Sequence, residues 1–402
     1  MNPCRWRAGR GVATRRAAAY HRPVSSTAPL IRASEDRLKT LVTGEAILYR
    51  LFDVGYEIRL DQAYELLAST GPERRKPVRG EAHAIQIPNP PITVPLGTEG
   101  ASVGERTEQV QVSARIFDFG VISFRARLEL STRSWEDFVD HGIAAGSSGA
   151  WGVFDLCRSR LLDRLGPAIV RPEVATVSEE YIVYRINRIE DSSGGPIHLD
   201  SLPESDIARL LVGEARPLSA QARGDLLSHR YSYLDDDLTI VAWSAALVVE
   251  SVPEDTDVQY VLEFANAQLL ELRLYDAFLD AEVPRIYDEI EMARRGRVFG
   301  GGRFNRLLSV IQTRVADATE AVERAENSLK VTDDVFLARI YGAAIGIFRA
   351  EAWRSGIERK VRIVRETYAM LNAEAQTRRA EVLEITVILL IAFEIVLAIV
   401  RH

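Results

Sequence analysis

The stretch QVQVSARIFDFGVISFRARLEL, residues 109–130, decides the fold class of the first half of the chain. Two runs with alternating apolar positions meet at residues 118–120, where aspartate and glycine favour a turn. The pattern predicts either a β-hairpin or one long, bulged strand. Both alternatives place this stretch in a β-sheet.

Residues 38–252, which surround this stretch, mix strand-like runs with short helical runs and Gly/Pro turns. GEAILYRLF (44–52) and EEYIVYRINRIE (179–190) have strand patterns, and LTIVAWSAALVVE (238–250) fits a buried strand pair or one long strand. The fold class expected is α+β, with an N-terminal mixed α/β domain and a sheet of roughly five to seven strands.

The composition changes after Pro253, where Glu, Arg, Ala and Leu dominate, so residues 253–380 are expected to form long helices. Within the first of them, Arg273 and Asp276 are three residues apart and are expected to pair. Two apolar seams follow with heptad-like spacing. The first contains Leu307, Ile311, Val315, Val322 and Leu329, and the second contains Trp353, Ile357, Val361, Val364 and Tyr368. These seams predict either a helical hairpin or an oligomeric coiled coil.

The segment VLEITVILLIAFEIVLAIV, residues 382–400, is apolar around its whole circumference. As a helix it would be about 28 Å long, close to the roughly 30 Å of bilayer hydrocarbon. We therefore expect one C-terminal transmembrane helix, with a fully buried core helix as the alternative. Glu384 lies near the start of the segment, whereas Glu394 lies deep within it. Insertion of the Glu394 carboxylate into the bilayer would cost roughly 2–3 kcal/mol of free energy. Glu394 is the best candidate for a contact between helices of an oligomer, and Glu384 is the second.

The charges are distributed unevenly along the chain. The first 34 residues hold seven arginines and no acid, so residues 1–37 are expected to be a disordered basic arm or an organellar presequence. The formal charge of the remainder is −7 − 7 = −14, which disfavours direct nucleic-acid binding. The cysteines, Cys4 and Cys157, indicate neither a disulfide framework nor a metal-ligand pair.

Motifs of known chemistry are missing from the sequence. There is no Walker loop, dinucleotide fingerprint, HExxH or Gly-x-Ser-x-Gly motif. The acids at 235–237 fit a solvated turn better than a cation site, and His198, Asp200 and His229 lack metal-ligand spacing. We therefore predict no catalytic, cofactor-binding or metal-binding residue, and no enzyme.

Several ordered blocks resemble the required-for-meiotic-nuclear-division family, a domain of unknown function also called the YagE family. They are ARIFDFGVISF (114–124), QLLELRLYDAFLDAEVPRIYDEI (268–290), the stretch from 333 to 371, and RRAEVLEITVILLIAFEIVLAIV (378–400). The resemblance covers roughly residues 45–402. The Arg-rich arm and the Pro-rich stretch 71–107 depart from the family pattern.

The resemblance implies a membrane-anchored, self-associating scaffold without catalytic residues. Eukaryotic relatives are mitochondrial inner-membrane proteins that form large homo-oligomers and support translation of organelle-encoded proteins. The expected partners are therefore the membrane, further copies of the chain, and a ribosomal or other protein. The bulk of the chain is expected on the cytoplasmic side of a bacterial inner membrane, or on the matrix side of the mitochondrial inner membrane. The alternatives are an ion-transport or channel-like component built around Glu394, and an enzyme with an unrecognised pocket in the α/β domain.

Overall fold

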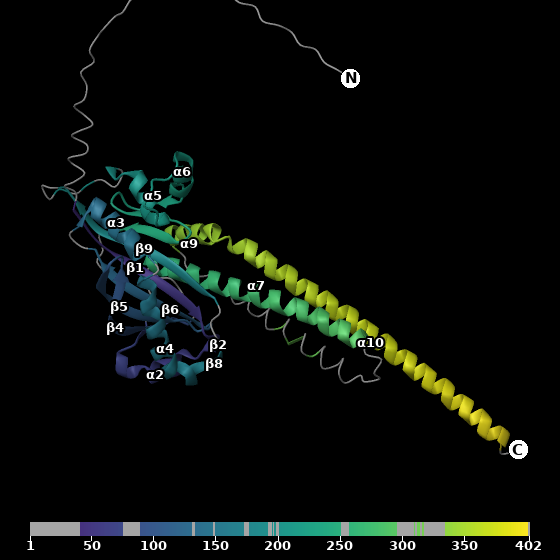
Figure 1. The fold of residues 1–402 in the computed structure, drawn as a ribbon. Coiled ribbons are helices and arrows are strands. Elements are labelled where there is room, and N and C mark those ends of the chain that lie inside the picture. The colour runs from purple at the N-terminus through teal and green to yellow at the C-terminus, as the bar shows by residue number, and fades with distance from the viewer. Residues whose placement is uncertain are drawn as a thin grey trace, which may run out of the picture.

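The structure is a computed structural model, which describes residues 41–74, 89–130, 133–147, 149–172, 177–191, 201–250, 257–295 and 334–400, with isolated positions between them. A mixed α/β domain comes first and long helices follow it (Figure 1). The predicted order of a mixed α/β domain followed by long helices is therefore confirmed. The arm 1–37 and the first seam (Leu307, Ile311, Val315, Val322 and Leu329) lie outside the described residues.

A ten-stranded sheet forms the centre of the α/β domain, in the order β10-β11-β12-β9-β1-β6-β5-β4-β3, with β7 paired to the end of β1. All its neighbouring strands are antiparallel except β12 and β9, which run parallel. The sheet is larger than expected because it includes three two-residue strands. Its strands are β1 Leu41–Asp53, β3 Glu73–Arg74, β4 Ile92–Val103, β5 Arg106–Ile116, β6 Val121–Glu129, β7 Arg133–Ser134, β9 Ser178–Glu190, β10 Arg230–Tyr231, β11 Leu238–Val241 and β12 Ala245–Val249.

The stretch 109–130 is a hairpin, so the first of the two alternatives is correct. Ile116 of β5 pairs with Ile122 of β6, and the Phe117 N–H donates to the Val121 carbonyl at 2.9 Å. Gly120 closes the turn with a φ of 94°, a conformation that residues with a Cβ atom rarely adopt. A Cβ atom at this position would lie 1.8 Å from the Gly55 carbonyl oxygen, in the small sheet of β2 (Gly55–Ile58) and β8 (Ile169–Pro172). Glycine is therefore required here for two independent reasons.

Gly120→Ala is expected to lower the free energy of unfolding by about 2–4 kcal/mol, since the new methyl group meets backbone and the positive φ is strained. Gly152→Ala is the matched control, because a Cβ atom there has no neighbour within 4 Å. Urea denaturation followed by circular dichroism measures both changes. Equal effects of the two substitutions would contradict the argument.

Helices cover both faces of the sheet, because the central strand β1 is apolar on both sides. Ala46 and Leu48 face one core, and Ile47, Tyr49 and Leu51 face the other. The first core is covered by α2 (Leu60–Leu66), α3 (Trp135–Ala145), α4 (Val153–Leu165) and α5 (Glu204–Val212), next to which lies α6 (Ala220–Leu227). The second core is covered by α7 (Asp257–Arg295) and α9 (Val335–Ile347).

Helix α7 continues past the sheet and packs along α10 (Ala350–Val400). Leu272 and Leu279 of α7 form a small core with Ala350, Ile357 and Val361 of α10. The two helices lie side by side over this part, and α10 then extends beyond α7 to the C-terminal end (Figure 1). At 51 residues, α10 is about 75 Å long. We call the paired part of α7 and α10 the helical arm.

The expected transmembrane helix is a wrong prediction. Among the residues that the structure describes, no helix is both long enough and apolar enough to cross a membrane. Within the segment 382–400, the side chains of residues 382, 398 and 400 lie outside the described part. The segment 382–400 is the end of α10, continuous with a strongly charged first part, and Glu384 and Glu394 interrupt its apolar surface. The predicted single-pass location in a bacterial or mitochondrial inner membrane depended on this helix and is therefore also wrong.

Candidate functional site

The second predicted seam faces α7. Ile357, Val361 and Val364 are buried, and Trp353 is half-buried beside the same core. The side chain of Tyr368, the last residue of this seam, lies outside the described part. Because α7 runs in the same direction alongside this part of α10, it covers the seam without a second copy of the chain. The seam residues of α10 are therefore used inside one chain, at least as far as Val364.

A lysine between two aspartates holds the helical arm together. The Lys360 ammonium of α10 donates to Asp276 Oδ1 at 2.7 Å and lies 2.6 Å from Asp280 Oδ1, both on α7. Burial lowers the pKa of Lys360, but these hydrogen bonds outweigh burial and raise the pKa above its ordinary value. Asp276 of α7 therefore forms its ion pair with Lys360 of α10. Its expected partner Arg273 instead pairs with Glu179 of β9 and fastens α7 to the sheet.

Lys360→Met is expected to lower the free energy of unfolding by about 1 kcal/mol, a value discounted because the lysine side chain is 23% exposed. Since folding raises the lysine pKa, this stabilisation is complete below the unfolded value of 10.5 and is lost as the pH rises through the folded value. Thermal unfolding at pH 7 and pH 11 measures it. Arg359→Met, at an exposed neighbouring position, is the control and should change little.

Beyond the helical arm, α10 carries the largest exposed apolar surface of the described residues. We call residues 383–399 the distal apolar segment. Its large apolar side chains are 41–70% exposed, and a contiguous apolar surface of this kind usually marks a site of interaction with another molecule. They are Leu383, Ile385, Val387, Ile388, Leu389, Leu390, Ile391, Phe393, Ile395, Val396, Leu397 and Ile399.

The charged residues within this segment are Glu384 and Glu394. Both are exposed, and neither has an ion pair or side-chain hydrogen bond with any other described residue. Because consecutive helical residues point in different directions, the apolar side chains surround the helix on all sides. Such a helix presents its apolar surface to whatever molecule covers it.

A second cluster of polar groups lies under α7 at the sheet. Glu263 of α7 forms an ion pair with Arg115 of β5, and the Arg115 guanidinium lies 4.7 Å from the centre of the Tyr260 ring. The Glu263 side chain is 1% exposed. Burial, and then the charge of Glu263, raise the pKa of Tyr49 to about 12, so its phenol stays protonated at neutral pH.

This buried cluster has the composition of a structural contact. Next to it, burial and the charge of Arg125 lower the pKa of Arg127. Glu263 thus lies among cations and a phenol, whereas general acid–base catalysis uses a pair of groups with separated pKa values facing a substrate. In the ranges that the structure describes, no three His, Cys, Asp or Glu side chains converge as metal ligands.

The acidic run at 235–237 forms a turn between β10 and β11. The Asp237 carboxylate accepts hydrogen bonds from the backbone N–H groups of Tyr233 at 2.7 Å and Leu234 at 3.0 Å. His229 lies in the short link between α6 and β10, and His198 and Asp200 lie outside the described residues. The carboxylate therefore closes its own loop.

Comparison with known proteins concerns the α/β domain. The family model described as "Uncharacterized protein MJ0711, N-terminal domain" matches residues 43–256, a little over half of the chain. The chain belongs to this family. Its matched part runs from β1 to the residue before α7, so the family domain is the sheet with the helices of its first core.

A curated relative gives the same result. The "Uncharacterized protein MJ0711" of Methanocaldococcus jannaschii is 21% identical over 223 residues, which are 56% of this chain. The match covers 66% of that protein, slightly less than two thirds of its length. The MJ0711 N-terminal-domain family and this relative are both described only as uncharacterized.

Proposed function

We propose that this protein is a non-enzymatic, self-associating scaffold related to the required-for-meiotic-nuclear-division (YagE) family. Its α/β domain would bind a protein partner, and α10 would join copies of the chain. The observation that carries the proposal is the distal apolar segment. Its exposed side chains would be covered when several α10 helices pack together.

The arrangement of the two ends of α10 supports this division of roles. The apolar seam in the first part of α10 packs against α7 of the same chain, so the seam is not available to other copies. The distal apolar segment lies beyond the end of α7 and is available. Because it is apolar on all sides, one neighbouring helix covers only part of it, and a bundle of three or more helices covers it better than a dimer.

Glu394 and Glu384 are proposed as contacts inside such a bundle. A carboxyl group within an apolar helix bundle needs a hydrogen-bonding partner, and the equivalent residue of another copy provides one. A single polar position of this kind also selects the register and the number of helices. Glu394→Leu is therefore expected to change the number of chains in the assembly.

The test is the mass of the intact protein. A single chain is 44.8 kDa, and size-exclusion chromatography with light scattering should give a mass of at least three chains that falls on dilution. A mass of one chain at every concentration would overturn the proposal. Addition of phosphatidylcholine vesicles provides a second arm: single chains that sediment with vesicles would show that lipid, and not a second copy, covers the segment.

The protein partner is proposed from the family resemblance, which suggests a ribosomal component. Affinity purification of the intact chain, compared with a chain that ends at residue 380, tests it. Ribosomal proteins recovered in fixed ratio with both forms would place the partner on the α/β domain or the helical arm. Recovery of the chain alone would contradict the scaffold part of the proposal while leaving self-association to the mass measurement.

A further inference from the structure

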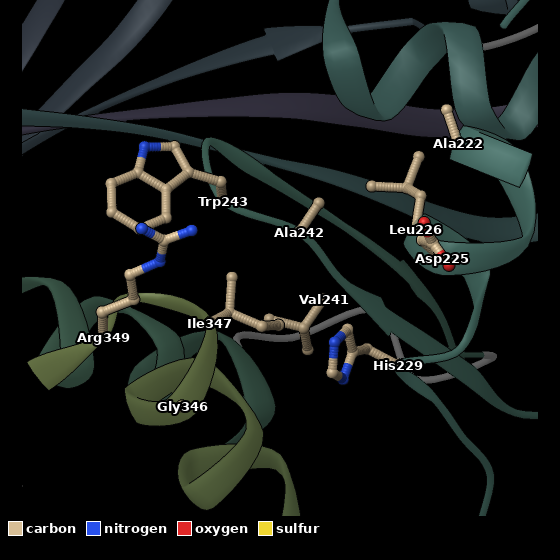
Figure 2. A pocket seen from close by; sticks show the side chains of 10 residues that line it. All are labelled: Ala222, Asp225, Leu226, His229, Val241, Ala242, Trp243, Gly346, Ile347 and Arg349. Carbon is tan, nitrogen blue, oxygen red and sulfur yellow. The ribbon is translucent and has the colours of Figure 1, made fainter. Parts of the chain in front are cut away.

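A cavity of about 550 Å³, wide open to solvent on one side, lies where α6, the β11–β12 hairpin and the α9–α10 junction meet. Figure 2 shows its lining side chains, which come from three separate parts of the chain. The volume is within the roughly 300–1,000 Å³ typical of small-molecule sites. The cavity is far from the distal apolar segment and belongs to neither cluster described above.

One end of the cavity combines an aromatic ring with an unused cation. Trp243 lies in the tight turn between β11 and β12, and its side chain is 52% exposed. Phe348 contacts it edge-on, with ring centres 6.1 Å apart, and steadies the indole. Figure 2 shows the Arg349 guanidinium turned toward this indole. Arg349 has no ion pair or side-chain hydrogen bond with any residue in the described ranges.

The backbone of Arg349 is in a conformation that arginine adopts at a cost. Its φ is 53°, in the left-handed region, where it separates α9 from α10. Its carbonyl accepts hydrogen bonds from the N–H groups of Ala352 and Trp353, which begin α10. A residue with a Cβ atom costs about 1 kcal/mol more here than glycine. An arginine at this position lowers the stability of the fold and places a guanidinium at the cavity.

The other end of the cavity carries groups of different chemistry. His229 and Asp225 lie there, across from Trp243 and Arg349 (Figure 2). Between the two ends, the side chains of Val241 and Ile347 provide an apolar wall. A compound that fits this arrangement has an anionic group at one end, a planar ring, and hydrogen-bonding groups at the other end.

We propose that this cavity binds a nucleoside monophosphate or a closely similar small anion with a planar ring. The ring stacks on Trp243, because indole favours flat π-systems. The phosphate is bound by the Arg349 guanidinium, whose planar donors match phosphate oxygens. Asp225 and His229 face the polar groups at the opposite end of the ligand. The proposal is independent of self-association.

The experiment is isothermal titration calorimetry of the full chain with AMP, GMP, CMP and UMP, and with inorganic phosphate alone. Binding of at least one nucleotide is expected, tighter than inorganic phosphate. Arg349→Gln should weaken it about tenfold or more, and Trp243→Ala about fivefold. Arg359→Gln, at an exposed cation on α10 away from the cavity, should leave the affinity unchanged.

Arg349→Gly separates binding from folding. It removes the guanidinium while relieving the left-handed backbone, so the melting temperature should stay equal or rise as nucleotide binding weakens by the same factor as in Arg349→Gln. Three results would overturn the proposal: no nucleotide binds to the unaltered chain, inorganic phosphate binds as tightly as the nucleotides, or Arg359→Gln weakens binding as much as Arg349→Gln.

Discussion

If copies of the chain pack through the distal apolar segment as proposed, replacing Ile388 and Ile395 together by lysine is expected to leave single chains of 44.8 kDa. The two residues are seven positions apart, so they lie on one side of α10, and their side chains are 57% and 55% exposed in the single chain. In a helix bundle they would become buried. Burial of an unpaired ammonium costs several kcal/mol, and each chain of the bundle would bury two.

The matched control is a lysine pair in the same helix but outside the distal apolar segment. Ala373 and Ala380 are also seven positions apart and exposed, and their replacement adds the same charge. This variant should keep the mass of the unaltered protein in light scattering. If the Ile388/Ile395 variant stays assembled, or if the alanine positions matter equally, the distal apolar segment is not the contact between copies.

Glu263→Leu is expected to lower the free energy of unfolding by about 3–5 kcal/mol, because it leaves the charge of Arg115 under α7 without its partner. A typical domain has only about 5–15 kcal/mol in total, so this one substitution removes a large share of the stability. The Arg115 side chain is 13% exposed, and water therefore replaces the lost carboxylate poorly. Urea denaturation followed by circular dichroism measures the loss.

The double variant Glu263→Leu/Arg115→Met is the decisive comparison. Removal of both charges leaves an apolar contact between α7 and β5, and replacement of a buried ion pair by apolar groups is often close to neutral. The double variant should therefore be more stable than Glu263→Leu alone. A coupling energy near zero in this cycle would show that the two side chains do not depend on each other.

Local patterns predicted several strands of the sheet but not β4, which lies in the Pro-rich stretch 71–107. The hairpin at 109–130 has its turn residues between two alternating runs, and the strand at 44–52 is apolar on both faces because helices cover both faces. Each signal lies within about ten residues of its own strand. The order of the strands did not follow from these signals, since β1 pairs with β9 through residues that are distant in the chain, from Phe52 with Ser178 to Leu41 with Glu190.

Spacing along a helix predicts that a seam is buried but does not identify what buries it. Ile357 and Val361 were expected to face a helix at 307–329 or another copy, and they face α7. Likewise, Arg273 and Asp276 are correctly spaced for a local pair, yet they form half-buried ion pairs with Glu179 and Lys360 instead. An exposed pair three residues apart gains only about 0.2–0.5 kcal/mol, so tertiary partners easily replace it.

The apolar end of α10 shows the same limit. Hydrophobicity predicted that residues 382–400 form a surface to be covered, but the prediction that a membrane covers it was wrong, because no helix in the described residues is long and apolar enough to cross one.

The sequence by itself determined the α/β domain followed by long helices, several of the strands and the position of the exposed apolar surface, because these depend on residues close together in the chain. Only the tertiary structure decided which helix pairs with α10 and brought Trp243 beside Arg349, since both depend on contacts between distant segments.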